Sequence, residues 1–272
     1  MDVKTLQLSN GITLEYAEQG GPSGTVLICL HGYADSWRSF EPLFNYLPPT
    51  IHVFAVSQRG HGRSDRPLEG YTPSDFAADI ALFIDGLNLG AAIIVGHSMG
   101  ATIAQRFALD FPQKTKALIL IGAIASFPIN KTMAELEVAV AALNDPVDSS
   151  FAEEFQKSTL VRPVHPLFFQ TVVHESLLLP ARVWKAILAP LMSVDYTKEL
   201  HTLNKQVLLV RGSEDSFATT WDQDRLLESI TGAQLVVYDG TGHAVHWEEP
   251  QRFAREVEDF VYKVVQGGPV HP

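Results

Sequence analysis

The chain has 272 residues, 46% hydrophobic and 19% charged, which is enough for one globular domain with an insertion or for two small domains. Its net charge of −11, without any cluster of Lys and Arg, argues against nucleic acid and against an anionic membrane surface as partners. The single cysteine, Cys29, excludes an internal disulfide, and no Cys/His group has zinc spacing, so no metal is expected. There is no signal-peptide pattern and no run of ~20 apolar residues, so a cytoplasmic location is expected.

Strands and helices alternate along the first and last parts of the chain. Val3–Ser9 and Ile12–Glu18 alternate in polarity around Asn10-Gly11, which predicts an antiparallel hairpin at one edge of a sheet. Continuous apolar runs, typical of strands covered on both faces, lie at Thr25–His31, Ile51–Ser57, Ala91–Val95, Lys116–Ile124, Gln206–Arg211 and Gln234–Tyr238. Helical spacing lies at Ser36–Leu47, Ser74–Leu87, Ala101–Phe111, Thr220–Ile230 and Pro250–Val265.

The alternation stops in the middle of the chain. Between Ser126 and Asn204 there is no buried strand, only helical segments near Lys131–Asn144, Ser149–Ser158, Pro166–Leu177 and Pro180–Met192. This pattern predicts an α/β protein with a mostly parallel, eight-stranded sheet covered by helices on both faces. Residues 1–125 and 205–272 are expected to form the core, and residues 126–204 a helical cap inserted after the sixth strand. Ligands of such sheets bind beyond the carboxyl ends of the strands, so the cap should cover the site.

The sequence Gly96-His97-Ser98-Met99-Gly100 joins a buried strand to a helix. In this context the Gly-x-Ser-x-Gly pattern predicts a sharp turn that exposes a nucleophilic serine. Gly96 and Gly100 are expected to leave room where a Cβ would meet the adjoining helix or strand. Ser98 is therefore the candidate nucleophile.

A serine nucleophile needs a base, and the base needs an orienting acid. Asp215 and His243 each follow a predicted strand after the cap, in the order Ser, Asp, His, and so at the same end of the sheet as Ser98. Glu214 is the alternative acid and His246 the alternative base. Asp239 precedes a glycine and is better explained by turn formation, while His97, on the turn itself, is expected to serve packing.

Two backbone N–H groups should stabilise the oxyanion that forms during acyl transfer. One is expected from Met99, directly after the nucleophile. The other is expected from Tyr33, in the loop after the strand Thr25–His31, where Gly32 lets the backbone approach the site. His31 is expected to organise this loop.

Several of these segments together resemble the α/β-hydrolase family. They are Leu30-His31-Gly32, the loop Gln58–Asp65, Gly96–Gly100, the Asp215 loop, and Gly242-His243 with Glu248-x-Pro250. Within that family the chain resembles capped serine esterases, lactonases and carbon–carbon bond hydrolases. Ser98 stands where dehalogenases and epoxide hydrolases of this fold carry an aspartate, so the resemblance does not extend to their chemistry.

The resemblance implies hydrolysis of a small-molecule substrate through an acyl-enzyme, without a cofactor. The substrate is expected to be a small, mainly apolar carboxylic ester or lactone, because such pockets are mostly apolar. The aromatic candidates for lining the pocket are Trp37, Phe127, Phe155, Phe168 and Trp184. Carbon–carbon bond hydrolysis, cofactor-free perhydrolase or oxygenase chemistry on the same triad, and a ligand receptor with little turnover remain alternatives.

Overall fold

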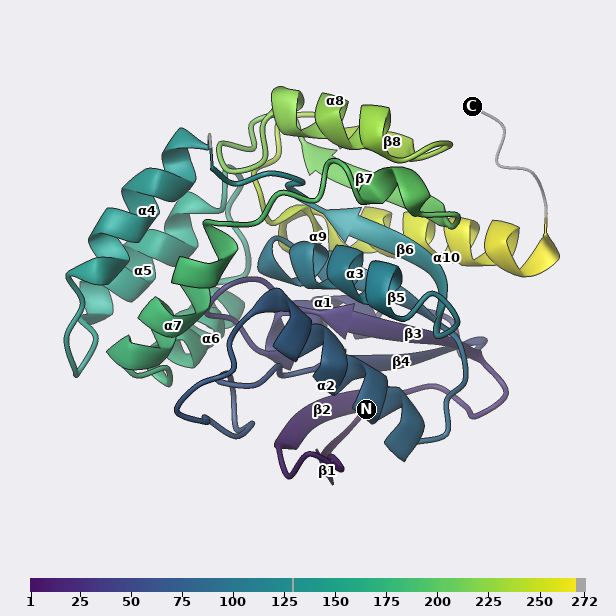
Figure 1. Cartoon of the computed structure of the whole chain (residues 1–272), viewed down its shortest axis with the longest axis horizontal. Coiled ribbons are helices and arrows are strands. Elements are labelled where there is room, and N and C mark those ends of the chain that lie inside the picture. The colour runs from purple at the N-terminus through teal and green to yellow at the C-terminus, as the bar shows by residue number, and fades with distance from the viewer. Residues whose placement is uncertain (129, 268–272) are drawn as a thin grey trace.

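The computed structural model describes residues 1–128 and 130–267. Within these residues, eight strands form one sheet in the order β1-β2-β4-β3-β5-β6-β7-β8 (Figure 1). Only the pairs β1/β2 and β2/β4 are antiparallel. The strands are β1 (Asp2–Gln7), β2 (Thr13–Gln19), β3 (Thr25–Leu30), β4 (Ile51–Val56), β5 (Ala92–His97), β6 (Thr115–Ile121), β7 (Gln206–Gly212) and β8 (Gln234–Tyr238). The mostly parallel eight-stranded sheet is therefore confirmed.

The predicted hairpin forms the edge of the sheet. Between β1 and β2 the Leu8 N–H donates to the Ile12 carbonyl at 2.8 Å, and Gly11 adopts a φ of +87°, a backbone conformation that favours glycine. The Asn10 side chain donates to Asp79 Oδ1 at 2.8 Å, which ties the turn to a neighbouring helix. The hairpin thus closes one side of the sheet.

Helices cover both faces of the sheet, as predicted. Successive residues of a strand point to opposite faces, so Ile28 and Leu27 of β3 belong to separate apolar clusters. Ile28 shares its cluster with residues of α2 (Pro73–Gly86), α3 (Met99–Asp110) and α8 (Thr220–Ser229). Leu27 shares the other cluster with residues of α1 (Glu41–Phe44), α9 (Val245–Glu248) and α10 (Pro250–Gln266).

The helix predicted over Ser36–Leu47 is two short pieces instead. A 3₁₀ helix, η1 (Trp37–Phe40), is followed by the single turn of α1. Pro42 lies at the start of α1 and has no backbone N–H, so it cannot continue the hydrogen-bond ladder of the preceding turn. Helical periodicity alone did not reveal this break.

The helical insertion after β6 is confirmed. It contains α4 (Lys131–Ala141), α5 (Ser149–Ser158), α6 (Pro166–Leu177) and α7 (Ala181–Leu191), and η2 (Leu200–Thr202) precedes β7. Figure 1 shows these four α-helices grouped together beside the end of the sheet toward which β6 points. The division into a core of residues 1–125 and 205–272 and a cap of residues 126–204 remains a prediction.

The segment that leads from β6 into the helical insertion is hydrogen-bonded to the segment that leads back to β7. The Phe127 N–H donates to the Val194 carbonyl at 2.9 Å, and the Tyr196 N–H donates to the Ala125 carbonyl at 2.8 Å. These two bonds join the segments that connect the insertion to the rest of the chain. In the described ranges, no helix has the length and apolar character needed to cross a membrane.

Candidate active site

Ser98 lies on a sharp turn between β5 and α3. Its backbone φ of 53° and ψ of −116° fall outside the regions that L-residues normally adopt. A Cβ on Gly96 would lie 2.3 Å from the Gly100 carbonyl oxygen, and a Cβ on Gly100 would lie 2.1 Å from the Leu30 carbonyl oxygen. The two glycines therefore leave the room that the sequence predicted, and Ser98 is half-buried between two buried neighbours.

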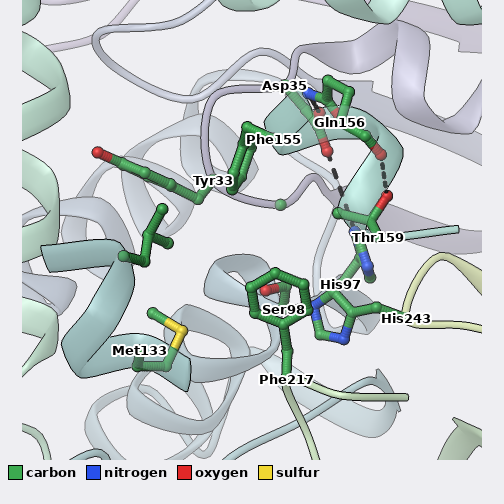
Figure 2. Close-up of a pocket in the computed structure, with 12 residues that line it drawn as sticks. Tyr33, Asp35, His97, Ser98, Met133, Phe155, Gln156, Thr159, Phe217 and His243 are labelled. Carbon is green, nitrogen blue, oxygen red and sulfur yellow. Dashed lines mark hydrogen bonds and ion pairs between the residues drawn. The ribbon is translucent and has the colours of Figure 1, made fainter. Parts of the chain in front are cut away.

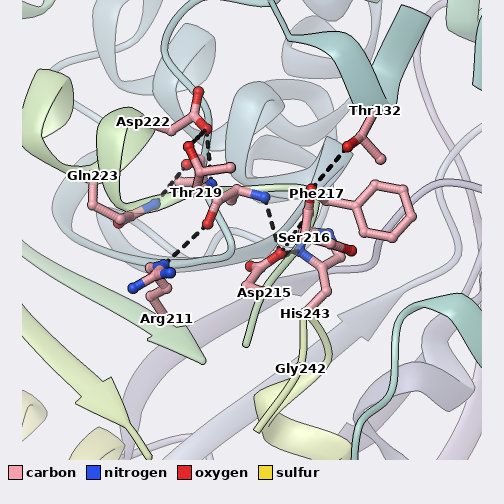
Figure 3. Close-up of polar contacts among 12 residues, drawn as sticks. Thr132, Arg211, Asp215, Ser216, Phe217, Thr219, Asp222, Gln223, Gly242 and His243 are labelled. Atoms are coloured by element: carbon pink, nitrogen blue, oxygen red, sulfur yellow. Dashed lines mark hydrogen bonds and ion pairs between the residues drawn. The ribbon is translucent and has the colours of Figure 1, made fainter. Parts of the chain in front are cut away.

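His243 and Asp215 form a buried pair on loops that follow β8 and β7. The His243 Nδ1 lies 3.0 and 2.9 Å from the two Asp215 carboxylate oxygens. Asp215 Oδ1 also accepts hydrogen bonds from the Phe217 N–H at 2.8 Å and from the Ala218 N–H at 2.9 Å, as Figure 3 shows in part. Three donors thus fix the carboxylate, which fixes the imidazole in turn. Among the described residues His243 Nε2 has no hydrogen-bond partner, so this nitrogen is available as a base.

Gly122, directly after β6, packs closely against the His243–Asp215 pair. Its φ is +54°, and a Cβ there would lie 2.7 Å from His243 Cε1 and 3.3 Å from Asp215 Oδ2. Only a residue without a side chain lets the imidazole lie this close to the backbone. The loop after β6 carries no carboxylate, but its glycine leaves the space that the His243 ring occupies.

The cap holds the loop that carries His243. The Thr159 carbonyl, just after α5, accepts the His243 N–H at 2.9 Å. Glu248 Oε1 accepts the Gly242 N–H at 3.0 Å and the Val161 N–H at 2.9 Å. One carboxylate thus joins the cap to the loop that carries His243, which gives the Glu248-x-Pro250 motif a physical role.

The alternative acids and bases occupy other places. The Glu214 side chain accepts a hydrogen bond from the Ser213 hydroxyl at 3.4 Å, and Asp239 is exposed in a turn. His246 Nε2 lies 3.2 Å from Ser39 Oγ, and burial lowers the pKa of His246 to about 3. The ring of His97 lies between those of His246 and His243, at centroid distances of 4.5 and 4.9 Å, and burial lowers its pKa well below the usual value. Both rings are therefore neutral packing groups at neutral pH.

The loop after β3 is organised by His31. Its Nε2 accepts the Gln58 N–H at 3.0 Å, so Nδ1 carries the proton and donates to the Gly32 carbonyl at 2.8 Å. Burial lowers the pKa of His31 to about 4, which keeps the ring in this neutral form. The loop brings Gly32 and Tyr33 to the pocket that contains Ser98, while Met99 is buried at the start of α3. The oxyanion roles of Tyr33 and Met99 remain predictions.

One pocket brings the candidate residues together (Figure 2). Its free volume is about 30 Å³, and it opens to solvent. Ser98, His97 and His243 line it together with Gly32, Tyr33, Asp35, Met133, Leu136, Phe155, Gln156, Thr159 and Phe217. In Figure 2 the His243 and Phe217 rings lie next to each other, with their centroids 4.9 Å apart, and Ser98 lines the same pocket.

Of the five predicted aromatic wall residues, Phe155 lines this pocket and four lie elsewhere in the described structure. Trp184 packs behind the wall, with its ring 5.5 Å from that of Phe155. Phe127 is buried in the larger apolar cluster, and Phe168 packs edge-on against a tryptophan, with its ring at 5.5 Å. Trp37 is buried under the sheet and faces a separate surface groove. Four of the five predicted wall residues therefore pack within the fold.

Sequence reasoning missed several residues of the pocket. Met133 and Leu136 of α4 form its apolar end, and Phe217 packs its ring 4.9 Å from that of His243. Asp35 is buried in the wall, where burial raises its pKa to about 7, and its Oδ1 accepts from Gln156 Nε2 at 2.8 Å. Asp35 lies three residues after Gly32, in the loop that was predicted to reach the site, and this position could have identified it as a pocket residue. Among the described residues, no group of three or more His, Cys, Asp or Glu side chains could hold a metal ion.

A mostly parallel sheet with a Gly-x-Ser-x-Gly turn after its fifth strand, and with Asp and His on loops after later strands, defines a hydrolase-type α/β protein. The model of the alpha/beta hydrolase family matches residues 27–256. The chain therefore belongs to this family.

Individual relatives are similar to this chain in sequence or in structure. An esterase from Rhodococcus sp. ECU1013 has 26% identity and a TM-score of 0.86, over 97% of this chain and all of that one. A putative 2-succinyl-6-hydroxy-2,4-cyclohexadiene-1-carboxylate synthase from Bacillus subtilis is 23% identical over 97% of this chain and 100% of its own length. A 2-(acetamidomethylene)succinate hydrolase from Mesorhizobium japonicum is 41% identical, but over only 40% of this chain and 39% of its own.

Proposed function

We propose that the protein is a serine hydrolase that cleaves a small, mainly apolar carboxylic ester or lactone. The observation that carries the proposal is a single pocket that holds Ser98 on its strained turn and His243 bonded to Asp215. A hydroxyl, a base and an orienting carboxylate are the groups that acyl transfer requires.

The reaction has two steps. Ser98 Oγ attacks the substrate carbonyl while His243 Nε2 takes its proton, and the Tyr33 and Met99 N–H groups stabilise the oxyanion. His243 then protonates the leaving alkoxide, and an acyl-enzyme remains. Water, deprotonated by the same nitrogen, attacks the acyl group, and the acid leaves as Ser98 recovers its proton. Asp215 keeps the proton on Nδ1 and stabilises the imidazolium cation.

The pocket supports a small and uncharged substrate. Its free volume of about 30 Å³ is small beside the roughly 300–1,000 Å³ of typical small-molecule sites, which favours a small substrate. Met133, Leu136 and Phe155 make one end apolar, which suits the acyl chain or the ring of a lactone. Of the described residues, those that line the pocket include no Lys or Arg, and Asp35 adds an acidic group. A dicarboxylate such as the one named for the Mesorhizobium japonicum relative would therefore find no charge partner here.

The proposal is tested with p-nitrophenyl esters from acetate to decanoate and a panel of small lactones. Wild-type protein should turn over the short esters best, and Ser98→Ala should lower turnover by several orders of magnitude without unfolding the protein. Turnover of lactones alone would make the enzyme a lactonase by the same mechanism. Failure on every substrate, with Ser98 still labelled by a fluorophosphonate, would favour carbon–carbon cleavage or a receptor instead.

A further inference from the structure

The loop of residues 33–35, which carries the proposed oxyanion donor Tyr33, is bonded to the cap. The Tyr33 hydroxyl donates to the backbone carbonyl of Trp184 in α7 at 2.6 Å. Gln156 Nε2 of α5 donates to Asp35 Oδ1 at 2.8 Å, a bond that Figure 2 shows at the polar end of the pocket. Two cap helices thus hold two residues of one short loop.

A third cap helix holds the residue between them. Ser176 Oγ of α6 accepts from Gln156 Nε2 at 2.8 Å. The same hydroxyl lies 3.0 Å from the Ala34 carbonyl and 3.1 Å from the Val172 carbonyl, and its one hydrogen can serve either of them. The Gln156 side-chain nitrogen therefore donates one hydrogen to Asp35 in the loop of residues 33–35 and the other to Ser176 in α6.

These polar groups are shielded from water. Gln156 is 1% exposed, Ser176 is 0% exposed and Asp35 is 3% exposed. A buried polar group that loses its partner costs about 1–3 kcal/mol, because water cannot replace the lost bond. The bonded arrangement is therefore strongly preferred while the cap lies on the core.

The loop also has a backbone conformation that requires support. Ala34 has a φ of 60°, which for a residue with a Cβ costs about 1–2 kcal/mol. The neighbouring Gly32 is so closely packed that a Cβ there would lie 2.8 Å from His97 Nδ1. A strained residue persists only when its surroundings hold it, and here the cap supplies contacts on both sides of it.

We propose that the cap holds the loop of residues 33–35 in the position from which the Tyr33 N–H stabilises the oxyanion, with Gln156 and Ser176 as positioning residues. The inference rests on the proposed function, because it assumes that Tyr33 stabilises the oxyanion. Ser176 is not among the described residues that line the pocket, so it acts on the site through Ala34 and Gln156. The cap thereby contributes to the stabilisation of the transition state as well as to the shape of the pocket.

The test uses Ser176→Ala, which removes the buried hydroxyl, and Gln156→Met, which removes the amide donor but keeps a side chain of similar length. For p-nitrophenyl acetate we expect kcat to fall about 10- to 100-fold with KM changed less than about threefold, because a misplaced donor weakens only transition-state binding. The affinity for an alkylboronic acid, which forms a tetrahedral adduct on Ser98, should fall by the same factor. Amide hydrogen exchange in residues 31–37 should rise about tenfold in both variants.

Thr171→Val is the matched control, because it deletes a hydroxyl of α6 that donates to the Leu167 carbonyl of the same helix at 2.9 Å. It should leave kcat and the exchange of the loop unchanged. The proposal is overturned if both variants fold and keep kcat and loop exchange within about twofold of wild type, or if the control changes equally. If Ser176→Ala does not fold, Gln156→Met decides alone. If wild-type protein forms no acyl-enzyme, the proposed function fails, while the exchange measurement still decides whether the cap holds the loop.

Discussion

Asp35 is a carboxyl group enclosed in the wall of the pocket, and Asp35→Asn measures what its burial costs. The side chain is 3% exposed, and burial raises its pKa from 3.8 to about 7 despite the hydrogen bond from Gln156 and the nearby His243. Between these two pH values the folded protein holds a proton that the unfolded chain has released. The free energy of unfolding therefore falls as pH rises through this window, and the loss is complete just above pH 7.

The size of the effect follows from the two pKa values. The two pKa values differ by about three units, at about 1.4 kcal/mol each, so ionisation of Asp35 lowers the free energy of unfolding by about 4 kcal/mol at pH 8. Asparagine is neutral at every pH and can still accept the Gln156 hydrogen bond through its oxygen. Relative to wild type, the variant should become more stable by about 2.5 kcal/mol between pH 5 and pH 8.

Urea unfolding followed by circular dichroism at pH 5, 6, 7 and 8 gives the two stability curves. Glu228→Gln, which removes one carboxylate from the exposed surface of α8, controls for the change in net charge. The difference between Asp35→Asn and wild type should widen with pH, while the control runs parallel to wild type. Parallel curves for Asp35→Asn would refute the reasoning, because they would mean that Asp35 ionises alike in both states.

Two substitutions in the pocket and one pH profile test the site further. Gly122→Ala places a methyl group 2.7 Å from the His243 ring, so steady-state assays should show kcat reduced at least about tenfold; an unchanged kcat would contradict the packing described. Met133→Ala widens the apolar end of the pocket and should move the ester optimum to acyl chains longer by about two carbons, whereas an unmoved optimum would place the acyl group elsewhere. In the Asp35→Asn background, stability in urea should fall as pH drops below 6.5, because His31 and His246, with pKa values lowered by burial to about 4 and about 3, take up protons only on unfolding. A flat profile from pH 6.5 to pH 4.5 would show that these rings are not held neutral.

Features set by neighbouring residues were predictable from the sequence. The hairpin at Asn10-Gly11 and the turn at Ser98 depend on local backbone geometry, and Gly96 and Gly100 could be assigned because a Cβ there has no space in any such turn. The helix over Ser36–Leu47 failed for a local reason as well, since Pro42 interrupts it. The error lay in weighing periodicity above the missing N–H of a proline.

The pocket lining was not predictable in the same way. Periodicity shows that α4 has an apolar face, but not that Met133 lines the pocket together with Ser98 while Trp184 of α7 packs against Phe155 outside it. That choice depends on how four cap helices pack on the core, and no short stretch of sequence encodes it. The same holds for the contact between Gln156 and Asp35, which joins residues 121 positions apart.

The proposed function depends most on a covalent acyl group on Ser98. Wild-type protein and Ser98→Ala are mixed with p-nitrophenyl acetate, quenched in acid within the first turnover and examined by intact-mass and peptide mass spectrometry. Wild type should carry one acetyl group on the peptide that contains Ser98, released together with one equivalent of p-nitrophenol, and the variant should carry none. An acetyl group on another residue, or turnover that survives in Ser98→Ala, would contradict the proposed mechanism.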